Sequence, residues 1–428
     1  MKYMTLRMPR NNNQQMIKEE NIKLLFDLIT NKPGISRAQL VRLTQLSPTT
    51  VSTLVDELVQ RELVLETGPA DTHSAGRKPI TLKINPRGRQ LAAFSLSRWG
   101  IRFWLYNLTL EELDSGFLAH SADHYGGFEG DIQEKDPDAG EDYMALIESL
   151  LTASPQFDRS RLLSVCISFP GIYLEQEQAF SWSAMRVSIS EAAVRQLENR
   201  LMTPVFLGNA SMCRAYAEKT CLDRPKGSVT DLIYFNVCEG LGAGIISDGA
   251  FLTGRDHSAG EVGHVSIDYR GKRCACGLRG CVEQYVNIDA VMQRVHQTLD
   301  PSSNDKKSLS DIGRMCEQGH SAVQEVIDDV AAMLFTAIYS TVCITGVKCV
   351  VIGGGIEQLG PYFLKKLCSF AKENPHNKLA RGIDITYARS GLYGDGLGIV
   401  QFYLDNIFTV TAEPDEGLRR GAENLAMA

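Results

Sequence analysis

The sequence predicts an α/β protein in three parts: a small, mainly helical N-terminal domain followed by a body of two α/β lobes. The chain has 428 residues, more than one hydrophobic core ordinarily organises. Apolar residues recur at helical spacing up to about residue 60, whereas short apolar runs typical of strands recur after residue 89. Charge changes at the same place: residues 1–90 carry 14 Lys and Arg against 8 Asp and Glu, and the remaining 338 carry 30 against 43. A basic head on an acidic body indicates that the head meets a polyanion, although so modest an imbalance also arises by chance.

The composition is that of a soluble globular protein, with 44% hydrophobic and 22% charged residues. No apolar run approaches the roughly 20 residues that a membrane-spanning helix needs, and the N-terminus has no apolar core of a secretory signal. Eleven cysteines is an odd number, and most lie in apolar segments. That usage is typical of reduced, buried thiols, so we expect a cytoplasmic protein without a disulfide framework.

The first two predicted helices of the head are set by caps and apolar spacing. The first spans 16–30 and ends at the Asn31–Gly34 turn. Its apolar residues are Ile17, Ile22, Leu24, Leu25, Leu28 and Ile29. Ser36 caps the second helix and forms a capping box with Gln39, which places Leu40 and Leu43 inward.

The third predicted helix has Ser47 as its N-cap and Pro48 at its first position. Its apolar stripe consists of Val51, Leu54, Val55 and Leu58. Short hydroxyl side chains lie off this stripe near the helix start, at Thr49, Thr50, Ser52 and Thr53. Such side chains, together with Ser47, suit base edges and phosphates in a major groove of double-stranded DNA.

Two predicted strands, 63–66 and 80–84, follow the third helix and form a hairpin wing. The polar loop between them carries Gly76-Arg77-Lys78-Pro79, and Arg77 is a candidate for a minor groove. Residues 47–57 contain no Lys or Arg, so phosphate contacts are expected from Arg37, Arg42, Arg61, Lys78 and the arm of Arg7 and Arg10. The plainer interpretation is a small helical bundle whose hydroxyl residues only cap helices.

Strands and helices alternate in the body, which favours largely parallel or mixed sheets. The predicted strands are 91–96, 101–105, 163–169, 231–237, 243–247 and 349–352, and the clearest helices are 143–152, 189–201 and 322–342. Glycine-bearing turns follow strands at 170–171, 239–246 and 352–356. Each turn alone is explained by the sharp bends of any α/β protein.

The segment CACGLRGCVE (274–283) places three thiols within eight positions. Cys274, Cys276 and Cys281 with His264 make a Cys₃His set that suits a tetrahedral, structural zinc ion. A redox role requires a Cys-x-x-Cys pair, which this spacing lacks, and a core role fits poorly beside Arg273 and Arg279.

Together, AGEVGH (259–264) and CxCGxxGCxE (274–283) resemble the signature of the ROK family of repressors and sugar kinases. The resemblance covers essentially the whole chain, including a GR(K/R)P element of ROK repressors at 76–79. It implies a winged helix-turn-helix domain at 1–88 and an actin-like (ribonuclease H-like) ROK body at 89–428. The lobes would span roughly 89–208, to which the C-terminal helix returns, and 209–404. It also implies the same four zinc ligands and a sugar site, which we expect at Ser181, Asn209, Glu261, His264 and Glu283.

The sequence departs from ROK kinases in two phosphoryl-transfer elements. Where the kinases carry DxGGT, this chain reads SLSRWGIRF (95–103), with neither the acid nor the paired glycines that a nucleotide site uses. Asn209 is kept, but Ala210 stands at the general-base position, and an alanine methyl accepts no proton. A looser alignment places Ser181 where the kinases have a sugar-contacting Asn. No catalytic residue and no kinase activity are therefore expected.

The resemblance implies a transcriptional regulator, usually a repressor, of carbohydrate uptake or catabolism genes. Its expected partners are an operator in double-stranded DNA, a small carbohydrate effector and a second copy in a homodimer, or a tetramer. Three alternatives stay open: a protein effector, an ATP-dependent sugar kinase with a DNA-binding head, and a DNA-bound scaffold that has lost its ligand.

Overall fold

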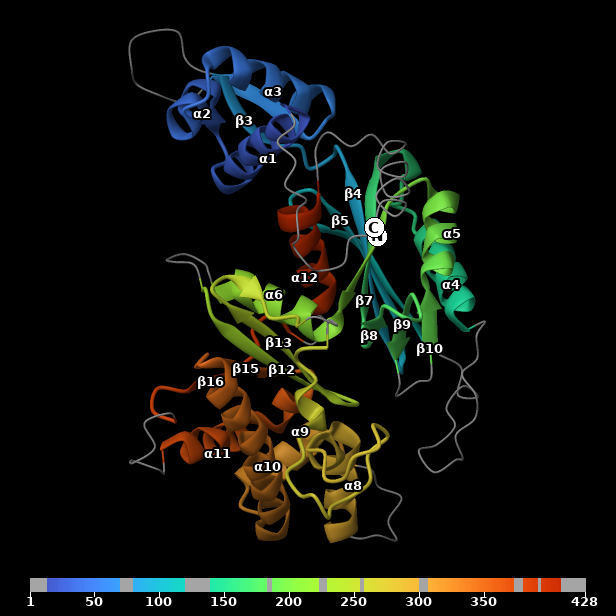
Figure 1. Ribbon diagram of the computed structural model, residues 1–428, viewed down its shortest axis with the longest axis vertical. Helices are drawn as coiled ribbons and strands as arrows, with labels where there is room; N and C mark the ends of the chain where they lie inside the picture. The colour runs from blue at the N-terminus through green and yellow to red at the C-terminus, as the bar shows by residue number, and fades with distance from the viewer. Residues whose placement is uncertain are drawn as a thin grey trace.

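The computed structural model describes residues 14–69, 80–119, 139–182, 187–222, 229–254, 258–299, 307–372, 380–391 and 394–408. A small head, a middle lobe and a second lobe follow one another along the longest axis of the molecule (Figure 1). The head consists of α1 (Gln14–Asn31), β1 (Ile35–Ser36), α2 (Arg37–Thr44), α3 (Pro48–Gln60), β2 (Val64–Pro69) and β3 (Ile80–Ile84).

The caps predicted for the head are present. Ser36 accepts a hydrogen bond from the Gln39 backbone N–H, and the Gln39 side chain accepts one from the Ser36 N–H, closing the capping box of α2. Ser47 caps α3 with Pro48 in its first turn. The inward placement of Leu43 is wrong, since its side chain is 50% exposed. Helix α2 is only eight residues long, and Leu40 alone on it is buried.

The first lobe contains a five-stranded sheet, a small three-stranded sheet and two helices. Its elements are β4 (Gln90–Ser97), β5 (Gly100–Asn107), β6 (Glu112–Ala119), α4 (Ala139–Ala153), η2 (Arg159–Arg161), β7 (Leu162–Phe169), β8 (Ile172–Leu174), β9 (Ala179–Trp182), β10 (Val187–Ser190), α5 (Glu191–Leu201) and β11 (Val205–Asn209). Helices α4 and α5 cover one face of the large sheet, and α6 and α12 lie on its other side (Figure 1).

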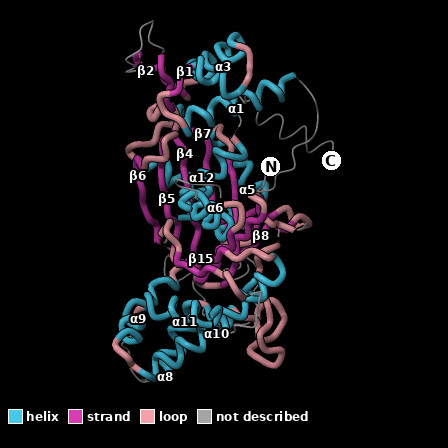
Figure 2. Tube along the Cα trace, turned by 90° about the vertical axis from the view of Figure 1, so that its left-hand side faces the viewer, coloured by secondary structure: helices cyan, strands magenta, loops and turns pink. Residues whose placement is uncertain are grey.

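The second lobe begins with α6 and contains most of the long helices. Its elements are α6 (Ala210–Leu222), β12 (Leu232–Val237), β13 (Leu241–Ser247), β14 (Ala250–Phe251), η3 (Val262–His264), α7 (Glu283–Val286), α8 (Ile288–Leu299), α9 (Leu309–Glu317), α10 (Ser321–Thr345), β15 (Cys349–Gly353), η4 (Ile356–Leu359), α11 (Gly360–Lys372) and β16 (Asp384–Tyr387). By length and composition α10 could cross a membrane, but ten of its residues are buried in the core of this lobe. Figure 2 shows α8, α9, α10 and α11 gathered at the end of the molecule opposite the head.

The two lobes repeat one topology. The first sheet has the order β6-β5-β4-β7-β11 and the second the order β14-β13-β12-β15-β16. In each, the first three strands form an antiparallel meander and the last two run parallel to the first strand of that meander. The duplication is that of the actin-like fold expected for the body. The turn of 97–100 between β4 and β5 therefore corresponds to the turn of 238–240 between β12 and β13.

Helix α12 (Gly394–Phe402) and the π-helical turn η5 (Tyr403–Ile407) return to the first lobe and continue toward the head. Phe402 stacks on Phe206 of β11, with ring centroids 5.9 Å apart. Phe408, which follows η5, meets Phe26 of α1 edge to face at 5.6 Å. The head and the first lobe therefore share one continuous apolar core, which includes Ile22, Leu25 and Ile399.

Candidate functional site

The four predicted metal ligands lie together in the second lobe. His264 ends η3, and the three cysteines lie on the loop that follows. Bridges between Ser266 and Cys281 and between Arg273 and Arg279 fold this loop into a narrow hairpin. Gly280 has a φ of +71°, and a Cβ atom there would lie 1.7 Å from the Asp268 carbonyl oxygen, so this turn requires glycine.

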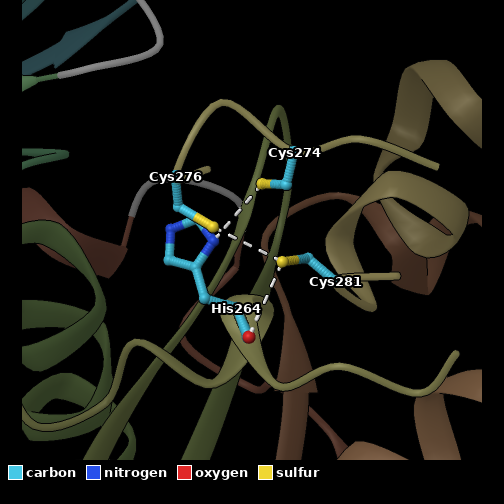
Figure 3. A group of neighbouring side chains, drawn as sticks. All are labelled: His264, Cys274, Cys276 and Cys281. Atoms are coloured by element: carbon cyan, nitrogen blue, oxygen red, sulfur yellow. Dashed lines mark hydrogen bonds between the residues drawn. The ribbon is translucent and has the colours of Figure 1, made fainter. Parts of the chain in front are cut away.

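The donor atoms of His264, Cys274, Cys276 and Cys281 all lie within 4.8 Å of one another (Figure 3). His264 Nδ1 is 3.6 Å from Cys274 Sγ, and the Cys276 and Cys281 sulfurs are 3.5 Å apart. Bonds of about 2.3 Å to sulfur and 2.0 Å to nitrogen in a tetrahedron give ligand separations of about this size. The cluster therefore fits a four-coordinate metal ion, with no coordination position left for a substrate.

The second nitrogen of His264 faces a carboxylate. Nε2 lies 3.7 Å from Glu261 Oε2, while Nδ1 faces the thiols. A carboxylate on the far side of a metal-bound imidazole fixes the ring orientation and raises its basicity. Burial raises the pKa of the Glu261 carboxyl, an effect that His264 opposes and Glu283 reinforces.

Glu283, the first residue of α7, lies against the same cluster. Its Oε1 is 3.3 Å from Cys274 Sγ and 3.5 Å from His264 Nδ1. On its other side, a Cβ atom placed on Gly240 would lie 3.4 Å from Glu283 Oε2. Three of the predicted sugar ligands, Glu261, His264 and Glu283, thus lie together against the loop that carries the three cysteines, and we call this group the Glu283 wall.

The other two predicted sugar ligands, Asn209 and Ser181, meet at Gly171. The Asn209 amide donates to the Gly171 carbonyl at 2.9 Å, and its side-chain oxygen accepts from the N–H groups of Ser211 and Met212. A Cβ atom on Gly171 would lie 2.3 Å from the Ser181 carbonyl oxygen. Asn209 therefore caps α6, a structural task that leaves it little capacity for a ligand.

The general-base position is apolar in the folded chain. Ala210 is the first residue of α6 and is buried. The neighbouring Ser211 lies beside β13, because a Cβ on Gly242 would lie 2.7 Å from its hydroxyl oxygen. The start of β13 thus lies between the Asn209 group and the Glu283 wall.

The hydroxyl side chains predicted to read DNA divide into two groups. Ser47, Thr49 and Thr53 are exposed at the start of α3, and Thr50 is half-buried beside the Ser47 cap, with the two hydroxyls 2.8 Å apart. Ser52 instead faces α2, and its hydroxyl and carbonyl both accept hydrogen bonds from Arg37 Nη1.

The predicted phosphate contact Arg37 is held inside the head. Its Nη2 lies 2.6 Å from Asp56 Oδ1 and 2.8 Å from Glu66 Oε1. Burial opposes the charged form, but the two carboxylates outweigh it and raise the pKa of Arg37. The guanidinium therefore joins α2, α3 and β2, and phosphate binding would have to compete with these acids.

The remaining basic candidates are differently placed. Arg61 pairs with Glu57 at 3.1 Å. Arg42 is exposed and lines a hollow on the head together with Lys32, Pro33, Gly34, Ile35, Gln39 and Leu43. Arg77, Lys78, Arg7 and Arg10 lie outside the described residues.

A sequence model of the ROK family matches residues 133–396, well over half of the chain. The chain belongs to the ROK family. The xylose repressor of Caldicellulosiruptor bescii is 28% identical over 365 residues, which cover 83% of this chain and 88% of that protein. The DNA-binding transcriptional dual regulator NagC of Escherichia coli K12 is 27% identical over 366 residues, which cover 81% and 83%.

Solved ROK structures extend the comparison to the fold. A ROK family transcriptional regulator, a homologue of the E. coli MLC protein, matches 91% of this chain and 97% of its own with a TM-score of 0.73 and 25% identity. A ROK glucokinase from Streptomyces griseus matches 73% and 98% with a TM-score of 0.59 and 18% identity, a likeness of fold alone. The match to the regulator includes the head, which explains its larger share of the chain.

Sequence reasoning missed a buried charged pair in this ROK body. Asp395 of α12 accepts hydrogen bonds from Ser95 of β4 and from Ser168 of β7, the latter at 2.8 Å. Arg214 Nη2 of α6 lies 3.7 Å from the same carboxylate. The available signal was an aspartate between two glycines in an otherwise apolar stretch, YGDGLGIV.

Proposed function

We propose that this ROK protein is a DNA-binding transcriptional repressor whose operator affinity is set by a small sugar or sugar derivative bound in its body. One observation carries the proposal. A capped helix with exposed hydroxyls, in a helix-turn-helix head, is joined to a body whose general-base position holds the buried Ala210. The names of the relatives, xylose repressor and NagC, support it.

The head would place α3 in a major groove, with Ser47, Thr49, Thr50 and Thr53 at base edges and phosphates. Two heads of a homodimer, or of a tetramer, would read the half-sites of a pseudo-palindromic operator. Arg77 and Lys78 of the wing would reach the flanking minor groove or its phosphates. This role places the protein in the cytoplasm, where the DNA is.

Gel-shift titration with DNA from upstream of the protein's own coding sequence tests the head. Thr53→Ala should weaken specific binding by about 1 kcal/mol, the net value of one neutral hydrogen bond. Thr152→Ala is the matched control, because both threonines are exposed and donate to the carbonyl four residues earlier in a helix. Equal affinities of the two variants would exclude Thr53 from the interface.

We infer that zinc occupies the Cys₃His cluster and has a structural role. Zinc supplies four strong bonds that hold the 264–283 segment, and the chain's own residues then present Glu261 and Glu283 on one wall. Cys276→Ser should therefore lower both thermal stability and sugar affinity. Metal analysis and thermal unfolding of the variant test the first effect, and calorimetric sugar titration tests the second. Unchanged sugar binding after complete chelation would separate the metal from the sugar site.

Helix α12 offers the physical route from the body to the head. Its first turn holds Asp395 between the lobes, and the residue after η5, Phe408, packs on Phe26 of α1. A sugar that binds one arrangement of the lobes better than another would shift the population of that arrangement and, through α12, the position of the head.

The effector class is tested by adding xylose, N-acetylglucosamine or glucose to the gel-shift titration. A change in operator affinity with one of them is expected. Insensitivity to all three, with DNA binding intact, would favour a protein effector or a scaffold without a ligand. A coupled ADP-release assay with the same sugars should give no turnover; measurable phosphorylation would restore the kinase alternative.

A further inference from the structure

The two equivalent hairpin turns of the duplicated lobes are joined by one side chain. Arg98 lies in the β4–β5 turn of the first lobe, and its Nε is 3.7 Å from Glu239 Oε1 in the β12–β13 turn of the second. The Arg98 side chain is only 13% exposed. The sequence departs from ROK kinases at this turn, and in the fold the turn carries a cation that reaches the other lobe.

The stronger partner of Arg98 is Asp289, in the first turn of α8. Arg98 Nη2 donates to Asp289 Oδ1 at 2.7 Å, and Nη1 donates to the second carboxylate oxygen. Such a two-bond contact fixes orientation as well as distance. The Trp99 ring lies 4.4 Å from the guanidinium carbon and is 61% exposed. An aromatic face on a largely buried guanidinium adds a cation–π attraction.

The backbone next to Glu239 is bonded to the backbone next to Asp289, and both stretches lie close to the Glu283 wall. The Ile288 N–H, next to Asp289, donates to the Cys238 carbonyl at 3.0 Å, next to Glu239. Gly240 lies against the Glu283 carboxylate, which in turn contacts Cys274. A shift of Glu283 would therefore move the backbone that carries Glu239 and Asp289.

We propose that Arg98, Glu239 and Asp289 form an interlobe latch that holds the two lobes in one relative orientation and that releases when a ligand displaces the Glu283 wall. The contact crosses 191 residues of sequence and joins the β4–β5 turn of the first lobe to helix α8 of the second. Its release by a ligand and its consequence for DNA binding rest on the proposed function, whereas the contact between the lobes does not.

Hydrogen exchange on the full chain, without DNA or sugar, tests the latch. In Asp289→Asn, amides of the turns at 97–100 and 238–240 should exchange about tenfold faster, the order expected for losing a partly buried, two-bond ion pair. Asp329→Asn is the matched control. Asp329 pairs with Arg294 of the same helix α8 at 2.9 Å, but both lie within the second lobe.

Equal exchange in wild type, Asp289→Asn and Asp329→Asn would overturn the latch. If Asp289→Asn weakened the whole lobe, Arg98→Lys decides, because it keeps the charge and loses the two-bond geometry. Faster exchange confined to the two turns in Arg98→Lys supports the latch, and wild-type exchange there refutes it. Gel shifts of Asp289→Asn then separate the two proposals. Faster amide exchange in the two turns, with unchanged operator binding and sugar response, would support the latch and exclude its regulatory role.

Discussion

The buried pair of Asp395 and Arg214 gives the sharpest stability prediction. The Asp395 side chain is 1% exposed and that of Arg214 is 12% exposed. Asp395→Asn keeps an oxygen that can accept from Ser95 or Ser168, but it leaves the Arg214 guanidinium without its counter-charge. Removing one partner of a buried pair costs about 3–5 kcal/mol. Because Arg214 keeps some exposure and the charged atoms are 3.7 Å apart, the lower end, about 3 kcal/mol, is expected.

Combining Asp395→Asn with Arg214→Met should recover most of this loss, since replacing both charges of a buried pair is often nearly neutral. Urea unfolding followed by circular dichroism measures both effects, provided that midpoints are compared at equal slopes. Asp405→Asn is the control, because Asp405 is an exposed acid just beyond α12 that accepts from the Tyr216 hydroxyl at 2.6 Å. A wild-type midpoint for Asp395→Asn, or a double variant no better than the single one, would refute the reasoning.

Three further predictions concern Phe408, Glu261 and Asp27, an acid of α1 that pairs with Lys23. Phe408→Ala should weaken the packing of the head on the first lobe by up to about 3 kcal/mol, which calorimetric unfolding measures. It should also reduce the effect of sugar on operator affinity while the affinity without sugar changes little, which gel shifts measure. Burial raises the pKa of Asp27, an effect opposed by Lys23 and reinforced by Asp405. The charged carboxylate therefore lowers stability at neutral pH, and this cost fades as pH falls toward and below the raised pKa. Asp27→Asn should flatten this part of the pH dependence of Tm, and an unchanged profile would contradict the prediction. Glu261→Gln should weaken zinc binding about 10–100-fold in a chelator competition, whereas Glu317→Gln, distant from the cluster in sequence and in another helix, should not.

Local features of the fold were predictable because their partners are close in sequence. Ser36 and Gln39 are three residues apart, and Ser47 caps the N–H of Thr50. The Cys₃His cluster spans only 264–281, so its spacing predicted the four residues that the structure brings together. Each cap, and the Cys₃His cluster, forms within one short segment, so the local sequence is enough to predict it.

Long-range partners were not predictable from the same patterns. Arg37 was expected at a phosphate, but Asp56 and Glu66 hold it, because β2 packs beside α3. Ser95 and Asp395 are 300 residues apart, and no local spacing connects them. Asn209 is predicted as a sugar ligand, and its amide also donates to the Gly171 carbonyl, 38 residues away, a partner that no local spacing indicates.

The end of β4 connects the two halves of the proposed regulation. Ser95 on this strand donates to Asp395 at the start of α12, and Arg98, three residues later, holds Glu239 and Asp289 of the second lobe. A change at the Glu283 wall would reach Arg98 through the backbone around Gly240, and the β4 strand would pass it to α12. The far end of that helix packs, through Phe408, on the head. Packed side chains and ion pairs of this kind are among the contacts that can carry coupling between distant sites. The turn at which the sequence departs from ROK kinases therefore carries, in Arg98, the contact by which the second lobe would act on the head.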